Sequence, residues 1–349
     1  MGGLKFSKKV LKFNILTPEI GFQGEEQLVE VRVDPLTGWR ARINMMRRMR
    51  IKQVSQLQLE PFGKKDFLQE CPFCPGNIER KTPMFPEDIV DGGRLKMGEA
   101  TLFPNRYGFS EHHAVVVLTR KHYVPIGEFK AQSLHDAIRL SLQFLQRLSH
   151  RSKVLYAWIN WNYMPPSGAS VIHPHLQVTA ERSSSWALKE LLKKSLMYYR
   201  RRKRGYWLQL IETERRLRER FIGEDNYTVW LSSYAPRGNN EIIALQPSIS
   251  SLGEMEEEHV RSLSEGVSLL LKAYDGIGVN SFNMSTYSDE FHSKSKHFTL
   301  QFRFISRPRL VSYYTNDEGF MEILQLEPVI EQTPETTAKL LKPFFTGLQ

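Results

Sequence analysis

Two histidines and a glutamine alternate near the middle of the chain, in His173-Pro174-His175-Leu176-Gln177. Side chains alternate across a β-strand, so this spacing predicts that His173, His175 and Gln177 share one face of a strand. An imidazole can serve as base, nucleophile or metal ligand, and an amide can donate to a developing negative charge. The plainer alternative is an edge strand with a polar, solvent-facing side. The spacing by itself leaves both interpretations open.

The chain has two cysteines, and both lie in Cys71-Pro72-Phe73-Cys74-Pro75-Gly76-Asn77. A Cys-x-x-Cys pair followed by glycine is typical of a zinc knuckle, whose turn brings both thiolates to one tetrahedral ion. The alternative is a redox pair, which would start a helix after a strand. Here Pro75 and Gly76 follow at once, which favours zinc. Two thiolates are half of a tetrahedral site, so two more ligands are needed from elsewhere.

The segments around these residues predict an α+β protein. An apolar and aromatic run over residues 154–162 precedes the central motif, and a β-branched run over residues 113–119 predicts another strand. Between them, apolar residues at steps of four, four and three predict a helix within residues 126–150. These apolar residues are Leu134, Ile138, Leu142 and Leu145.

The second half repeats this order of elements. We therefore predict two duplicated units, each a mainly antiparallel sheet with a crossover helix, related by a pseudo-twofold axis. The N-terminal half would span residues 1–182. The C-terminal half would span residues 183–349 and begin with a long polar helical connector. The predicted segments are the connector at 183–221, strands at 241–246, 281–287 and 297–304, and a helix at 252–274.

A hairpin is predicted near the N-terminus. Residues 28–33 alternate like a strand, the turn residues of Asp34-Pro35-Leu36-Thr37-Gly38 follow, and residues 39–43 return. Arg32 and Arg42 are candidates for contacts with phosphate, although an ordinary hairpin explains the same pattern. Residues 1–27 are poorly patterned.

Composition indicates a soluble globular protein, with 41% hydrophobic and 25% charged residues in 349. No stretch approaches the ~18 apolar residues of a membrane span. The basic first residues are not followed by a signal-peptide pattern, so the cytoplasm is the expected location. The net charge of +10 suits anionic ligands. Two basic runs, at residues 47–52 and 200–204, lack an accompanying nucleic-acid-binding motif, so nucleic acid is not an expected partner.

Together these motifs resemble the galactose-1-phosphate uridylyltransferase branch of the histidine-triad (HIT) superfamily. The central motif is similar to that family's His-x-His-x-Gln strand, and the cysteine segment to its Cys-Pro-x-Cys-Pro-Gly-Asn. Arg32-Val33-Asp34-Pro35-Leu36-Thr37-Gly38 is similar to its Arg-x-x-Pro-x-Thr-Gly, and Phe103-Pro104-Asn105-Arg106-Tyr107 to its Asn-aromatic segment. The motifs occur in the family's order over residues 32–308.

The resemblance implies a structural zinc site. In the family, a histidine just past the strand that residues 113–119 would form is a zinc ligand, and His122 stands in that place. His112 and His113 are competitors at the other end of that strand. The implied ligands are Cys71, Cys74, His122 and His173, a closed set that leaves no position for water.

The resemblance also implies a reaction centre beside this metal. His175 would be the nucleophile that attacks the α-phosphorus of a nucleoside diphosphate sugar. Gln177 would stabilise the phosphoryl oxygens by an amide N–H. Asn105 would line the nucleoside pocket, whereas Asn162 and Ser170 would lie near the phosphates.

Two departures from the family pattern bear on the substrate. Leu176 replaces a glycine, but on a strand it would point away from His175. Many family members hold a second metal where this chain has Tyr287, Gln301 and Arg303, so that second metal site is predicted to be absent.

The resemblance predicts transfer of UMP or AMP between a nucleoside diphosphate sugar and a hexose 1-phosphate, through a covalent nucleotidyl-histidine. The alternative within the superfamily is a phosphorylase of ADP-sugars or dinucleoside polyphosphates. A third hypothesis is a non-catalytic protein that binds zinc and either a nucleotide or nucleic acid through the basic runs. The family further implies a homodimer.

Overall fold

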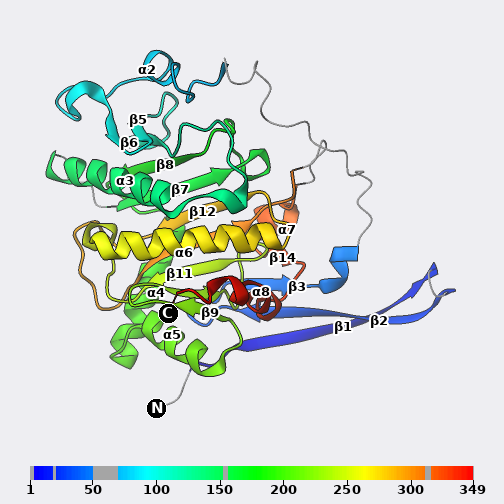
Figure 1. The fold of residues 1–349 in the computed structure, drawn as a ribbon. Helices are drawn as coiled ribbons and strands as arrows, with labels where there is room; N and C mark the ends of the chain where they lie inside the picture. Colours follow the sequence, from blue (N-terminus) through cyan, green and yellow to red (C-terminus); the bar gives the residue numbers. More distant parts are fainter. Residues whose placement is uncertain (1–3, 19–20, 50–69, 152–155, 311–315, 349) are drawn as a thin grey trace.

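The chain folds around one long antiparallel sheet, with helices on both of its faces (Figure 1). The computed structural model describes residues 4–18, 21–49, 70–151, 156–310 and 316–348. Within these residues the large sheet has ten strands, and a smaller sheet of four strands carries the N-terminus. This confirms the predicted α+β class.

The strand order of the large sheet is mirrored about its centre. It runs β4-β5-β6-β8-β7 and continues β12-β13-β11-β10-β9, so β7 and β12 join the two halves. In each half of five strands a helix lies between the third and fourth strands along the chain, α3 between β6 and β7 and α6 between β11 and β12. The predicted duplication with a pseudo-twofold relation is thus confirmed. The strands are β4 Leu95–Met97, β5 Ala100–Pro104, β6 His112–Val117, β7 Tyr156–Tyr163, β8 His175–Glu181, β9 Phe221–Glu224, β10 Val229–Ser232, β11 Ile242–Gln246, β12 Phe282–Tyr287 and β13 Leu300–Ser306.

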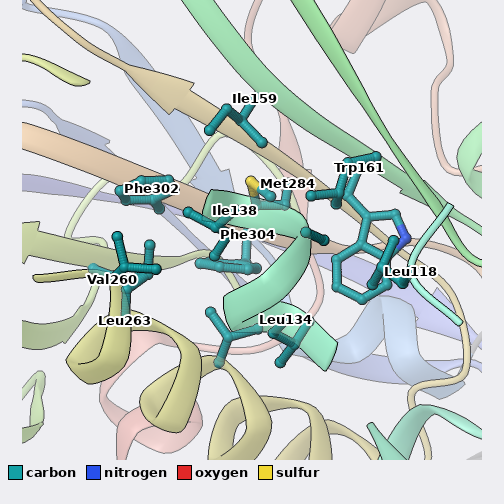
Figure 2. Close-up of a cluster of buried hydrophobic side chains, with 14 of the residues drawn as sticks. Leu118, Leu134, Ile138, Ile159, Trp161, Val260, Leu263, Met284, Phe302 and Phe304 are labelled. Atoms are coloured by element: carbon teal, nitrogen blue, oxygen red, sulfur yellow. The ribbon is translucent and has the colours of Figure 1, made fainter. Parts of the chain in front are cut away.

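Two long helices cover one face of this sheet and enclose the main core (Figure 2). Leu134 and Ile138 of the first helix pack there with Val260 and Leu263 of the second, over aromatic and aliphatic side chains of the central strands. Burial of these side chains is the chief stabilising term, at about 1.5–3 kcal/mol for each large one. The helices are α3 Ala131–Arg151 and α6 Glu257–Gly276, and the sheet residues of the cluster include Ile159, Trp161, Met284, Phe302 and Phe304.

The opposite face is covered only in part. Helices α4 (Trp186–Arg202) and α5 (Tyr206–Leu217) pack Leu191 and Leu210 on Leu231 and Leu245 of the second half. They form the helical connector predicted over residues 183–221. The break lies at Lys203, whose φ of 56° ends α4, and at Gly205, which caps α5.

A polar strip occupies the rest of this face. Paired residues cross the sheet from Gln177 on β8 to Asn160 on β7, then Ser285 on β12 and Arg303 on β13. All four are half-buried. An alternating strand that buries one face under helices leaves its other side chains for solvent or ligand. The strip therefore marks the face on which a site can form.

The smaller sheet has the order β1-β2-β3-β14 and ends in a long hairpin that projects from the body of the molecule (Figure 1). The strand β1 falls within residues 1–27, which the sequence pattern left without structure. Its lysines obscure the apolar alternation, yet Lys8 and Lys12 form ion pairs with Glu30 and Glu26 across the hairpin. The strands are β1 Ser7–Thr17, β2 Gln23–Val33, β3 Arg40–Ile43 and β14 Val329–Ile330; the remaining helices are α2 Ile78–Lys81, α7 Phe320–Ile323 and α8 Pro334–Leu341.

Most predicted elements agree with the structure. Helix α3 begins at Ala131, after the predicted start at 126, and all four predicted apolar positions are buried. Residues 154 and 155 of the predicted strand lie outside the described residues, and β7 begins at Tyr156. The division of the chain at residue 182 stays a prediction.

Candidate active site and metal centre

Four predicted metal ligands come together at the edge of the N-terminal half. The ligand atoms of Cys71, Cys74, His122 and His173 all lie within 4.8 Å of one another, and they are the one such His/Cys/Asp/Glu group found among the described residues. Cys74 Sγ lies 3.4 Å from His122 Nδ1 and 3.6 Å from His173 Nδ1. Cys71 Sγ lies 3.7 Å from His173 Nδ1.

These separations fit a tetrahedral zinc ion. Zinc–sulfur and zinc–nitrogen bonds of about 2.3 and 2.05 Å, at a tetrahedral angle, place sulfur about 3.6 Å from nitrogen. The knuckle that aligns the thiols depends on Gly76, whose φ of 83° is ordinary only for glycine. The amide of Asn77 donates to the carbonyl of Cys71 and holds the turn.

The surroundings of the cluster prepare it for a cation. His173 Nε2 donates to the backbone carbonyl of Thr119 at 2.7 Å, which leaves Nδ1 free to bind metal. Burial lowers the pKa of His173 to about 4, so its ring is neutral. Burial also raises the pKa of Cys74 to about 12, with a further contribution from Cys71. A bound cation would favour the thiolate form of Cys74 at neutral pH.

His175 lies beside the cluster with one ring nitrogen fixed. Its Nδ1 donates to the carbonyl of His173 at 2.8 Å, so Nε2 carries a lone pair. Burial lowers the pKa of His175, whereas this hydrogen bond acts in the opposite direction. Phe73, between the two cysteines, packs on the ring with centroids 5.2 Å apart. The knuckle thus positions the neighbouring histidine as well as the two thiols.

The prediction that His173, His175 and Gln177 share one face of a strand is confirmed for His175 and Gln177. His175 and Gln177 lie two apart on β8, but His173 precedes the strand, which begins at His175. His173 turns toward the cysteines because the chain is still irregular there. Leu176 is buried in the core on the opposite face, as predicted.

Gln177 contacts a histidine that had been considered only as a metal ligand. Its Oε1 lies 2.9 Å from Nε2 of His113 on β6. The same nitrogen lies 3.1 Å from the side-chain amide of Asn105, the predicted nucleoside contact. The structure therefore joins Asn105, His113 and Gln177 in one cluster.

Asn162 is fixed by the second half of the molecule. Asn283 on β12 donates from its amide both to Asn162 Oδ1, at 2.7 Å, and to the backbone carbonyl of Ser167, at 2.8 Å. Arg307 donates to the other end of the Asn283 amide at 3.0 Å. Asn162 therefore keeps its own amide N–H groups for other partners.

The loop between β7 and β8 is strained and tightly folded. Met164 has φ 71° and ψ 157°, a conformation that is rare outside glycine and costs on the order of 1–3 kcal/mol. Gly168, at φ 90°, ends the short turn that follows, and Ser170 is exposed just before the histidine motif. Strain of this kind is typical of functional loops.

Arg32 and Arg42 form ion pairs with carboxylates and not with the residues of the Cys/His cluster. The buried guanidinium of Arg32 is bound by Glu335 and Glu30 at 2.8 Å each. Arg42 pairs with Glu327 at 2.9 Å. Each arginine thus already has a carboxylate partner, and phosphate contact by either stays a prediction.

The three residues at the place of the family's second metal contact one another. Arg303 donates to Gln301 Oε1 from two of its nitrogens and lies 5.1 Å from the ring centroid of Tyr287. Glu241 balances its charge at 3.1 Å. The guanidinium therefore ends this side of the polar strip as part of a buried ion pair.

The basic runs lie on the surface where they are described. Arg200, Arg201 and Arg202 are exposed at the end of α4, as is Arg48 in the short 3-10 helix after β3, whereas Arg47 is half-buried. Arg50 and Lys52 of the first run lie outside the described residues. Among the helices that the structure describes, none combines the length and apolar character needed to span a lipid bilayer.

Sequence reasoning did not identify Phe73, His113, Asn160 or Asn283 as part of the site. The alternation of residues 160, 162, 283 and 285 in two predicted strands was a usable signal. Which strands neighbour one another, however, was not readable from one sequence.

Comparison with known proteins supports the fold. An uncharacterized protein of Archaeoglobus fulgidus is 31% identical over 347 residues, which is 99% of this chain and all of that protein. Among solved structures, an ADP-glucose phosphorylase from Arabidopsis thaliana matches with a TM-score of 0.72 and 15% identity, covering 90% of this chain and 98% of that one. A uridylyltransferase matches with a TM-score of 0.68 and 18% identity over the same shares. No protein-family model matches the sequence.

These matches place the duplicated sheet and its mirrored strand order among the GalT-like folds. The chain therefore belongs to one family with the Archaeoglobus fulgidus protein, and it has the fold of the uridylyltransferase and the ADP-glucose phosphorylase.

Proposed function

We propose that this chain is a nucleotidyltransferase that moves UMP or AMP from a nucleoside diphosphate sugar through a covalent intermediate on His175. The observation that carries the proposal is the hydrogen bond from His175 Nδ1 to the His173 carbonyl. It fixes the tautomer in which Nε2 is an unprotonated nucleophile, and burial of the ring keeps the imidazole neutral.

In the first step, the lone pair of His175 Nε2 attacks the α-phosphorus. The bond from that phosphorus to the bridging oxygen breaks, and the sugar 1-phosphate leaves with the electron pair. Gln177 donates an amide N–H to the phosphoryl oxygens, where negative charge is concentrated in the transition state. Asn162, Ser170 and the backbone at residues 167–169 supply further donors, while Asn105 holds the nucleoside.

In the second step, a phosphate oxygen of the acceptor attacks the same phosphorus and Nε2 leaves. With a hexose 1-phosphate as acceptor, the product is a new nucleotide sugar. The reaction then follows ping-pong kinetics, because the first product leaves before the second substrate reacts.

Zinc would be held by Cys71, Cys74, His122 and His173. All four positions of a tetrahedral ion are then protein ligands, so the metal would serve structure and not Lewis-acid chemistry. Its role would be to fix the residue whose carbonyl accepts the His175 hydrogen bond.

A phosphorylase is the second candidate. Inorganic phosphate would replace the hexose 1-phosphate as acceptor, so that the nucleotide leaves as a nucleoside diphosphate. Leu176 and the contact of Arg303 with Gln301 and Tyr287 depart from the uridylyltransferase pattern and favour this alternative.

We further propose a homodimer, which the family resemblance implies. The projecting hairpin carries Leu11, Phe13, Ile15 and Val29 on one face, and Phe13 is 43% exposed. An isolated two-stranded hairpin is only marginally stable, so a second copy covering this face would stabilise it. Light scattering tests the dimer: a monomeric mass at micromolar concentration would contradict it.

Product analysis separates the two reactions. The protein is incubated with UDP-glucose or ADP-glucose, and with either galactose 1-phosphate or inorganic phosphate. A transferase gives glucose 1-phosphate and a new nucleotide sugar, whereas a phosphorylase gives glucose 1-phosphate and UDP or ADP. Absence of products with these donors and with a dinucleoside tetraphosphate would contradict nucleotidyl transfer and favour a binding protein.

A further inference from the structure

His113 lies next to the reaction centre although neither the predicted zinc set nor the proposed chemistry uses it. The side chain is buried, on the same sheet face as His175 and Gln177. A loop closes over it: the ring of Phe109 lies 4.4 Å from the imidazole centroid, and the backbone N–H of Asn105 donates to the carbonyl of His113.

Three groups surround the ring, and they select a tautomer. The backbone N–H of Phe109 points at Nδ1 at 3.4 Å, so Nδ1 acts as acceptor. A proton on Nε2 then donates to Gln177 Oε1 at 2.9 Å. With the proton on Nδ1, the Phe109 contact would set donor against donor and Gln177 would face a lone pair. The Nε2–H tautomer therefore forms two hydrogen bonds, with Phe109 and Gln177. The Nδ1–H tautomer forms one, with Asn105.

We propose that His113 is a positioning residue, which holds the carbonyl end of Gln177 by an Nε2–H bond so that the amide N–H groups face the reacting phosphate. The inference rests on the nucleotidyl transfer proposed above. A free glutamine amide can rotate by half a turn and present its oxygen, which would repel phosphoryl oxygens. The histidine removes that orientation by occupying the oxygen.

The His113 ring lies between Asn105, at the proposed nucleoside end of the site, and Gln177, at the proposed phosphate end. Asn105 begins the loop that closes over His113, and its Oδ1 accepts from the backbone N–H of Tyr107. The Asn105 amide nitrogen consequently lies 3.1 Å from His113 Nε2, a contact that is not a hydrogen bond in the Nε2–H tautomer. A nucleoside that displaces Asn105 would act on the ring that orients Gln177.

The test is the rate of nucleotidyl-histidine formation in a single turnover, with whichever donor labels the wild type. His113→Leu should slow formation about 10- to 100-fold, the range typical of residues that orient a site. His113→Gln should recover much of the rate, because its amide nitrogen can reach the place of Nε2 and donate to Gln177. His112→Leu, one residue away on the other face of β6, is the matched control and should leave the rate unchanged.

A double-mutant cycle separates positioning from general stability. Once Gln177 is replaced by Ala, the further change His113→Leu should cost less than twofold, since nothing remains to orient. Fully additive effects of the two substitutions on the rate would overturn the inference. An unchanged rate in a His113→Leu variant that retains zinc and the wild-type melting temperature would overturn it as well. No adduct in the wild type would instead count against the proposed function.

A measurement without substrate provides a second readout. Nitrogen-15 NMR of labelled histidine should show His113 as the neutral Nε2–H tautomer, opposite to His175 with its proton on Nδ1. In Gln177→Leu the Nε2–H resonance of His113 should move upfield as its acceptor is lost. An Nδ1–H tautomer for His113 would contradict the inference independently of any activity.

Discussion

Two neighbouring histidines carry their proton on different ring atoms, and backbone carbonyls decide which. His173 donates from Nε2 to Thr119, and His175 donates from Nδ1 to His173. This leaves Nδ1 of His173 for a metal and Nε2 of His175 for a phosphorus atom. The two residues differ in role because the strand begins between them, so that His173 turns toward the knuckle.

At this scale the sequence predicted residue types better than contacts. The four ligands of the Cys/His cluster were named from the family resemblance, and the structure brings them together. The pairing of Gln177 with His113 could not be predicted, because it joins diagonal positions of strands whose register only the fold sets.

Removal of a metal ligand is the first prediction. The wild type should contain about one equivalent of zinc after mild purification, and Cys74→Ala should contain almost none. Because metal binding contributes to folding free energy, the melting temperature should fall clearly, for a loss of roughly 3 kcal/mol or more. Elemental analysis and calorimetry measure both.

The control is His112→Asn, which changes the competing histidine at the far end of β6. It should retain zinc, whereas His122→Asn should lose it. Zinc loss in His112→Asn with retention in His122→Asn would contradict the ligand assignment.

At the scale of elements, a buried ion cluster ties the N-terminal sheet to the second half. Glu335 on α8 binds Arg32 of β2 at 2.8 Å and Arg220, just before β9, at 2.7 Å. Burial would raise the pKa of Glu335, but the hydrogen bonds from Arg32 and Arg220 lower it to about 2. This cluster gives Arg32 a structural partner, and its predicted contact with phosphate stays a prediction.

Glu335→Gln should therefore destabilise the protein in a pH-dependent way. A carboxylate whose pKa falls on folding stabilises the native state above its unfolded pKa of about 4.3, and this is lost as pH falls toward 2. The variant should lose about 2–3 kcal/mol of unfolding free energy at pH 7. The difference from wild type should vanish between about pH 5 and pH 2.

The matched control is Glu26→Gln on the projecting hairpin. Its partner Lys12 is exposed, so the loss should stay below about 0.5 kcal/mol at any pH. If denaturant titrations at pH 7 gave equal losses of unfolding free energy for the two variants, the buried cluster would contribute no more to stability than the exposed ion pair.

At the scale of the whole molecule, the mirrored sheet brings residues of both halves together at the joint between β7 and β12. The order of predicted elements was enough to infer the duplication, because apolar periodicity and turn residues repeat in both halves. Which edges of the two units would join was not predictable. The joint between β7 and β12 places Asn283 against Asn162 and the loop before the histidine motif.

Asn283→Ala tests whether the second half serves the reaction centre of the first. The change frees Asn162 and the carbonyl of Ser167, so we expect nucleotidyl-histidine formation to slow about 10- to 100-fold. Zinc content should not change, since the cluster has no contact with Asn283 among those described. Single-turnover kinetics measures the rate.

Asn14→Ala, on the projecting hairpin, is the control and should react at the wild-type rate. An Asn283→Ala variant as fast as this control would show that Asn162 needs no support from the second half.

The central claim is that His175 carries the nucleotide, and one measurement tests it most directly. Intact-protein mass spectrometry follows incubation with UDP-glucose, and separately with ADP-glucose, for the wild type and for His175→Ala. We predict an acid-labile gain of one UMP or one AMP in the wild type and none in His175→Ala. The same adduct on both proteins would contradict the assignment of His175, and no adduct with either donor would contradict the proposed nucleotide-sugar chemistry.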